Sequence, residues 1–158
     1  MTAVIAAILA AFLAGAIALF REHRLQQRRL LVAARVTFAT FGVAANGIRT
    51  SLLADGWAPF NALPGGDSFS VTWDTNKGDL AGHLTWEEWR RVETAVNRYS
   101  ALTTMSQSES PDNVRGVMVP VQNALAEGSD ALRPYCTHRF SVWKLLRRRL
   151  ARKRIAGV

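Results

Sequence analysis

The chain has 158 residues, a formal net charge of +8 at pH 7 and a single cysteine, Cys136. One cysteine excludes an intramolecular disulfide, and the length limits the chain to one compact domain beside any membrane anchor. The charge is segregated, because residues 20–54 hold six basic residues and one acid, residues 55–130 five basic and eleven acidic residues, and residues 131–158 nine basic residues and no acid. Basic ends therefore surround an acidic middle.

Residues 2–20 read TAVIAAILAAFLAGAIALF and contain no charged side chain. As a helix rising about 1.5 Å per residue, this run spans roughly 28 Å, close to the roughly 30 Å hydrocarbon core of a bilayer. A cleavable signal peptide is the weaker interpretation, because no basic residue precedes the run and Arg21 follows it directly. A buried soluble helix is the other alternative, although such helices normally carry a polar face. We therefore predict a single transmembrane helix.

Four arginines flank this run on its C-terminal side: Arg21, Arg24, Arg28 and Arg29. Since positive flanks stay in the cytoplasm, they predict a cell-membrane protein with its N-terminus outside and its C-terminal domain cytoplasmic. Within the run, small residues form a ridge at a spacing of four: Ala7, Ala11 and Gly15. This ridge could support a homo-oligomer, although an Ala-rich helix also produces the spacing by chance.

After the arginines, apolar residues recur at alternating spacings of three and four: Leu31, Ala34, Phe38, Phe41, Ala45, Ile48 and Leu52. This stripe predicts that the anchor continues as one helix to about Ala54, where Asp55-Gly56 ends it. Gly42 and Gly47 could mark places where another helix packs closely. We expect the stripe to pack within the chain against four residues: Trp89, Val92, Val96 and Val121.

Residues 55–70 contain Pro59, Pro64 and Gly65-Gly66, which predict an ordered loop pressed onto the core by its apolar side chains. A short helix over 71–83 follows. Its spacing brings together Trp73, Leu80 and Leu84, although two glycines weaken it.

A stronger helix begins at Thr85, where Thr85 and Glu88 form a capping box. It runs to about Met105, and a polar break covers 106–110. The next helix starts at Ser110-Pro111-Asp112, with Ser as N-cap and Pro in the first turn. One broad apolar side is expected on it: Val114, Val117, Val121, Leu125 and Leu132. Pro120 should kink or restart this helix and Pro134 should end it.

The runs LLADGWAPFNALP and TWDTNKGDLAGHLTWEEWRRV carry three marks: Trp57, Trp73 and the Leu84–Trp89 helix start. Together they resemble uncharacterised small single-pass membrane proteins of GC-rich actinobacteria, over about residues 30–105. The resemblance implies a membrane-anchored or basic-helix architecture. It implies no activity, because that family has no assigned function.

Candidate catalytic and metal-binding groups are sparse. Cys136 and His138 belong to the one Cys/His cluster, and the other histidines, His23 and His83, are far away in sequence, whereas zinc needs about four ligands. A helix N-terminus and Arg139 would lower the thiol pKa, but a structural or solvent-facing cysteine is the simpler interpretation.

Carboxylates offer no better candidate. Glu87 and Glu88 are adjacent and would point about 100° apart on a helix, so they would not share a site. Asp74 and Asp79 have no histidine at a useful spacing. We therefore predict no catalytic residue, no metal and no cofactor.

The C-terminal run WKLLRRRLARKRIAGV is the strongest interaction feature. It predicts a basic amphipathic helix that lies on an anionic membrane surface through seven residues: Trp143, Arg147, Arg148, Arg149, Arg152, Lys153 and Arg154. Packing on the acidic middle of the chain, binding to nucleic acid and an ordinary solvated tail are the alternatives.

The predicted architecture is all-α: a transmembrane anchor at 2–20, a helical bundle domain at 21–134 and a basic amphipathic helix at 135–158. The predicted function is a membrane-anchored interaction or scaffold module at the inner leaflet. Its partners would be the lipid bilayer, anionic headgroups and an unidentified protein. A membrane-tethered enzyme subunit and a nucleic-acid-binding protein are the alternatives.

Overall fold

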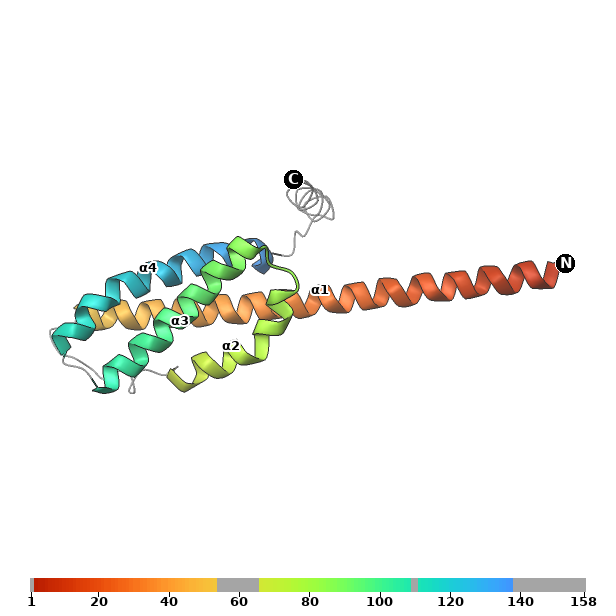
Figure 1. Ribbon diagram of the computed structural model, residues 1–158. Coiled ribbons are helices and arrows are strands. Elements are labelled where there is room, and N and C mark those ends of the chain that lie inside the picture. The colour runs from red at the N-terminus through yellow and green to blue at the C-terminus, as the bar shows by residue number, and fades with distance from the viewer. Residues whose placement is uncertain (1, 54–65, 109–110, 138–158) are drawn as a thin grey trace, which may run out of the picture.

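Four helices make up the part of the chain described by the computed structural model, which covers residues 2–53, 66–108 and 111–137. They are α1 (Thr2–Leu53), α2 (Gly66–Ala81), α3 (Trp86–Ser108) and α4 (Pro111–Cys136). No strand occurs among these residues, so the all-α class is confirmed. Figure 1 shows the N-terminal half of α1 projecting beyond a bundle that α2, α3 and α4 form with its C-terminal half.

Helix α1 is continuous from Thr2 to Leu53. This confirms the prediction that the apolar segment and the following stripe form one helix. Its environment changes at Leu30. Residues 10–29 are exposed apart from the half-buried Gln27, whereas Leu30 is only 4% exposed. The bundle therefore begins at Leu30, about 15 Å along the helix from Phe20 at a rise of about 1.5 Å per residue.

The buried face of α1 is broader than the predicted stripe. Ala34, Phe41 and Ile48 are buried as expected, while Phe38, Ala45 and Leu52 are only partly buried. Four buried residues were not part of that stripe: Leu30, Ala33, Thr37 and Ala44. The face is broad because α1 packs against both α4 and α2, which approach it from two sides.

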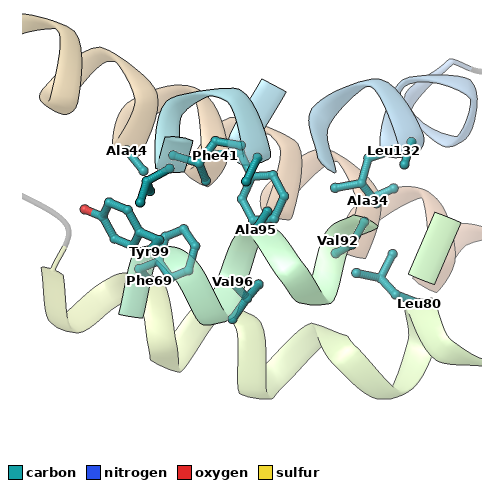
Figure 2. Close-up of a cluster of buried hydrophobic side chains, with 14 of the residues drawn as sticks. Ala34, Phe41, Ala44, Phe69, Leu80, Val92, Ala95, Val96, Tyr99 and Leu132 are labelled. Atoms are coloured by element: carbon teal, nitrogen blue, oxygen red, sulfur yellow. The ribbon is translucent and has the colours of Figure 1, made fainter. Parts of the chain in front are cut away.

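Aromatic rings connect three helices at the centre of the core. The Phe41 and Phe69 rings stack with their centroids 5.7 Å apart, and the Phe69 and Tyr99 centroids lie 4.3 Å apart. Figure 2 shows these rings beside Ala95. Burial raises the pKa of the Tyr99 phenol above its ordinary value.

The close approach between helices occurs at Gly128 of α4. A Cβ added there would lie 2.6 Å from the Phe41 ring and 3.0 Å from the Cβ of Ala95. No described element of the chain packs closely on Gly42, since a Cβ there would meet no atom within 4 Å. Glycine at 128 therefore lets α4 accommodate the Phe41 ring.

Helix α2 starts earlier than predicted. The proposed loop over 55–70 is wrong for 66–70, which are helical, and α2 ends at Ala81 instead of extending to 83. The physical reason for the early start is Phe69, which the helix places in the aromatic cluster. The rest of the proposed loop, 55–65, lies outside the described residues.

Helix α3 begins with the predicted capping box. The Thr85 backbone N–H donates to Glu88 Oε2 at 2.9 Å, and the Glu88 N–H donates to Thr85 Oγ1 at 3.3 Å. The predicted polar break is wrong for 106–108, because α3 extends to Ser108. The Ser106 hydroxyl is satisfied within this helix, because its Oγ donates to the Thr103 carbonyl at 2.7 Å.

Helix α4 begins at Pro111 as predicted and continues through Pro120 without restarting. The Arg98 guanidinium donates to the Pro120 carbonyl at 3.5 Å. The predicted end at Pro134 is wrong by two residues, because α4 extends to Cys136. Burial of Tyr135 explains the extension, since the last turn keeps this ring in the core.

Candidate membrane-binding site

Residues 10–20 of α1 form an exposed apolar segment that no other described element covers. Five large side chains lie on different sides of it: Phe12, Leu13, Ile17, Leu19 and Phe20. Phe12 is the most exposed, at 80%. In length and composition, this N-terminal helix is the one described helix that could cross a membrane. Water would solvate such a surface poorly, whereas hydrocarbon would accept it.

A cluster of exposed basic residues, which we call the collar, directly follows this segment: Arg21, Arg24, Arg28 and Arg29. The Arg24 guanidinium carbon lies 4.7 Å from the centre of the Phe20 ring, within cation–π distance. His23 and Gln27 share a hydrogen bond at 2.9 Å on the same helical stretch. The collar therefore joins the apolar segment to the bundle by an exposed, positively charged length of helix.

Helix α4 ends at the part of the bundle nearest the collar, which we call the proximal end. Arg35 Nε donates to the Cys136 carbonyl at 2.9 Å. This contact places a cation at the negative end of the α4 dipole, where positive charge is stabilising. Figure 1 shows α4 and the start of α3 at this same end. Thr137, the last residue that the structure describes, therefore lies close to the proximal end.

A hydrogen-bond network fixes the proximal end. Tyr135 Oη donates to Glu88 Oε2 at 2.6 Å, and the same oxygen accepts from the Thr85 backbone N–H and hydroxyl. The Tyr135 contact was not predicted, because it joins residues 47 positions apart through tertiary packing. Glu88 thus has a structural role, in agreement with the capping interpretation.

The thiol of Cys136 lies in the last turn of α4, and not at a helix start as the reactive-cysteine alternative requires. Its sulfur donates to the Leu132 carbonyl at 3.4 Å. Burial raises the pKa of the thiol, and the nearby Arg35 offsets part of that rise. The raised pKa favours the structural interpretation of this cysteine, while His138 and Arg139 lie outside the described residues.

The predicted site residues fall into two groups. Seven of them lie outside the described residues: Trp143, Arg147, Arg148, Arg149, Arg152, Lys153 and Arg154. Ala7, Ala11 and Gly15 lie on α1, and Gly15 has open space around it. Among the described residues, no group of three His, Cys, Asp or Glu side chains could hold a metal ion.

No protein-family model, no curated protein and no solved structure matches the chain. The resemblance to small actinobacterial membrane proteins stays a prediction.

Proposed function

We propose that this chain is a membrane-anchored interaction module, whose helix α1 spans the bilayer through residues 2–20 and holds the helical bundle at the cytoplasmic face. The observation that carries the proposal is the all-round exposure of large apolar side chains on 10–20 beside a bundle that closes its own core. A soluble protein would leave this surface in water at a cost of about 25 cal/mol per Å².

The collar supports the proposed orientation. Its four arginines lie within about 14 Å of the end of the apolar run at a helical rise of about 1.5 Å per residue, and positive flanks remain cytoplasmic. The Arg24–Phe20 contact supports this boundary, because a cation beside an aromatic ring is typical of the zone between hydrocarbon and headgroups. The N-terminus would therefore lie outside the cell.

The C-terminal segment would supply a second membrane contact. Arg35, which holds the end of α4, lies about 22 Å along α1 from Phe20 at a rise of about 1.5 Å per residue. The 21 residues from 138 to 158 would reach about 32 Å even as a helix. The segment is therefore long enough to return to the lipid surface, where its basic residues would each contribute about 1 kcal/mol near anionic lipid.

Membrane fractionation tests the anchor. We expect the full chain to remain with membranes in high salt and in carbonate, and a chain beginning at Arg21 to become soluble. A cytoplasm-dependent reporter fused after Val158 should be active. Recovery of the full chain in the soluble fraction would reject the anchor, and activity of a periplasm-dependent reporter would reverse the orientation.

Vesicle binding tests the second contact. The chain beginning at Arg21 keeps the whole described core and should bind anionic vesicles at low salt, with affinity falling as the roughly 10 Å screening length at 0.1 M shortens. Exchanging the six C-terminal basic residues from Arg147 to Arg154 for Gln should remove most binding, and Trp143→Ala should weaken it less. The control exchanges the exposed Arg90 and Arg91 of α3. Preference for nucleic acid over vesicles at equal salt would favour the nucleic-acid alternative.

A further inference from the structure

The face of α1 opposite the core carries its own repeat, which we call the outer seam. It consists of seven exposed residues: Val32, Val36, Ala39, Val43, Asn46, Thr50 and Leu53. Their spacings alternate strictly between four and three, which is the heptad spacing of coiled coils. Since the contacts of α1 with α2 and α4 occupy its other side, the described part of the chain leaves this seam without a partner helix.

The outer seam lacks the charges that normally cover a water-facing helix. Residues 36–48 read VTFATFGVAANGI and contain no charged side chain on any face. Gly42 weakens the helix by roughly 1 kcal/mol relative to Ala, yet nothing within the described chain approaches its open side. An approaching helix from outside the chain would explain both the missing charge and the glycine.

The heptad positions favour two parallel helices. Val36, Val43 and Thr50 occupy the a positions, where β-branched residues favour two-stranded coiled coils. In a parallel pair, the flanking g and e positions would place Gly42 of one copy opposite Gly47 of the other. Arg35 would face Thr40 of the other copy, and Arg28 would lie nearest to Ala33, which is buried in its own bundle. No like charges oppose each other at these flanking positions, so the face is electrostatically compatible with itself.

The same repeat continues back through the collar into the apolar segment. Its positions there are Arg29, Leu25, Glu22, Ala18, Gly15 and Ala11. Two of these six residues, Arg29 and Glu22, are charged. Small residues in a membrane helix let two backbones approach closely. Ala11 and Gly15 of the ridge and the outer seam are therefore parts of one face, although Glu22 and Arg29, which lie between them, would each oppose their own copy near the membrane surface.

We propose that the outer seam is a dimerisation surface and that its partner is a second copy of this chain, lying parallel in the same membrane. This pairing rests on the proposed anchoring, because a shared bilayer holds all copies parallel and at equal height. The seam then meets itself in register.

The area that two copies would bury indicates that the interface extends beyond the bundle into the apolar segment. From Val32 to Leu53 the seam measures about 32 Å, and a strip about 10 Å wide on each copy buries only about 600 Å² in total. Stable interfaces need about 1,000 Å² or more. Extending the strip back to Ala11 doubles its length and gives about 1,300 Å², so the anchor and the bundle are both needed for a stable pair.

Disulfide trapping in native membranes tests the pairing. The full chain carries Cys136→Ser, which keeps a donor for the Leu132 carbonyl, and then Val43→Cys. The matched control is Val71→Cys on α2, because Val71 is 64% exposed and Val43 is 58% exposed. With a copper oxidant, we expect a band of twice the monomer mass for Val43→Cys and at least fivefold less for Val71→Cys.

Three results would overturn the pairing: equal trapping of both variants, no trapping of Val43→Cys, or trapping of Val43→Cys to a chain of different mass. Mass measurement in mild detergent gives an independent readout, in which Val43→Arg should convert a dimer to a monomer and Val71→Arg should not. A carbonate-resistant monomer would reject the pairing and leave the anchor intact. A soluble full chain would reject the anchor, and its measured mass would still decide the pairing.

Discussion

The two halves of α1 differ in how much of their apolar surface the rest of the chain covers. Residues 10–29 are exposed nearly all round, whereas the half that starts at Leu30 is buried on one side and exposed on the other. The first half is apolar on every face up to Phe20, so no single face could satisfy it within a bundle. The same apolar composition therefore forms a buried core where a polar face accompanies it and an exposed apolar surface where none does.

A matched pair of phenylalanines gives the sharpest test of this comparison. Phe41 is 1% exposed beneath α2, α3 and α4, so Phe41→Asp should bury an unpaired charge and lower the unfolding free energy by more than about 4 kcal/mol. Thermal unfolding of the full chain in mild detergent, followed by circular dichroism, measures the effect. An unchanged melting temperature would show that this face of α1 is not core.

Phe12→Asp is the counterpart in the projecting half. It should leave the melting of the bundle unchanged, because Phe12 contacts no part of the core, but it should weaken membrane insertion by about 3 kcal/mol. Carbonate extraction measures the loss. If Phe12→Asp unfolds the bundle instead, the two halves of α1 are not independent.

A pair of glycines tests the close contact in the bundle half. Gly128→Ala should lower the unfolding free energy by about 1–3 kcal/mol, because the added Cβ would overlap the Phe41 ring. Gly78→Ala on α2, where a Cβ meets nothing within 4 Å, should raise it by up to about 1 kcal/mol. Effects of the same sign in thermal unfolding would contradict the close approach of α4 to α1.

The hydrogen bond from Tyr135 to Glu88 tests the proximal end. Tyr135→Phe should cost about 1–2 kcal/mol of unfolding free energy, because the donor to a carboxylate is lost from a buried position. Thr75→Ala on α2 is the control, since it removes only an exposed hydroxyl's bond to the Val71 carbonyl and should change stability by less than about 0.5 kcal/mol. Equal losses in urea unfolding would show that the network is not stabilising.

Local signals in the sequence predicted the features that depend on a few neighbouring residues. The Thr85–Glu88 capping box and the start of α4 at Pro111 are examples, because each needs only residues within one turn. The apolar positions of α3 and α4 were predicted equally well, with Val92, Val121 and Leu132 all buried. The spacing of apolar residues is enough to predict which positions are buried where a helix packs against the core through a single face.

Features that depend on distant residues were not predictable in this way. Helix α2 starts at Gly66, five residues before the predicted start at Val71. Its Phe69 ring packs against rings that belong to α1 and α3. Gly128 is explained by Phe41 and Ala95, which both lie far away in the sequence. The outer seam is visible as a repeat in the sequence, but only burial distinguishes it from the inner stripe that packs on the core.

The smallest expected effect concerns Arg35, which belongs to the bundle half but lies nearest the collar. Arg35→Met removes the bond to the Cys136 carbonyl and the cation at the end of α4, so stability should fall by at most about 1 kcal/mol. Because Arg35 lowers the pKa of the thiol against the larger effect of burial, its loss should raise that pKa further. The fraction of thiolate at a given pH, and with it the rate of alkylation, should then decrease.

Opening of the α4 end would act in the opposite direction, by exposing the thiol. The pH dependence separates the two effects, since a higher pKa moves the midpoint of the rate profile to higher pH, whereas exposure raises the plateau. Iodoacetamide labelling between pH 7 and the alkaline limit of folding measures both quantities. Arg49→Met, at an exposed position elsewhere on α1, is the control. A midpoint that does not move, or moves to lower pH, would show that Arg35 does not hold this end of the bundle through its charge.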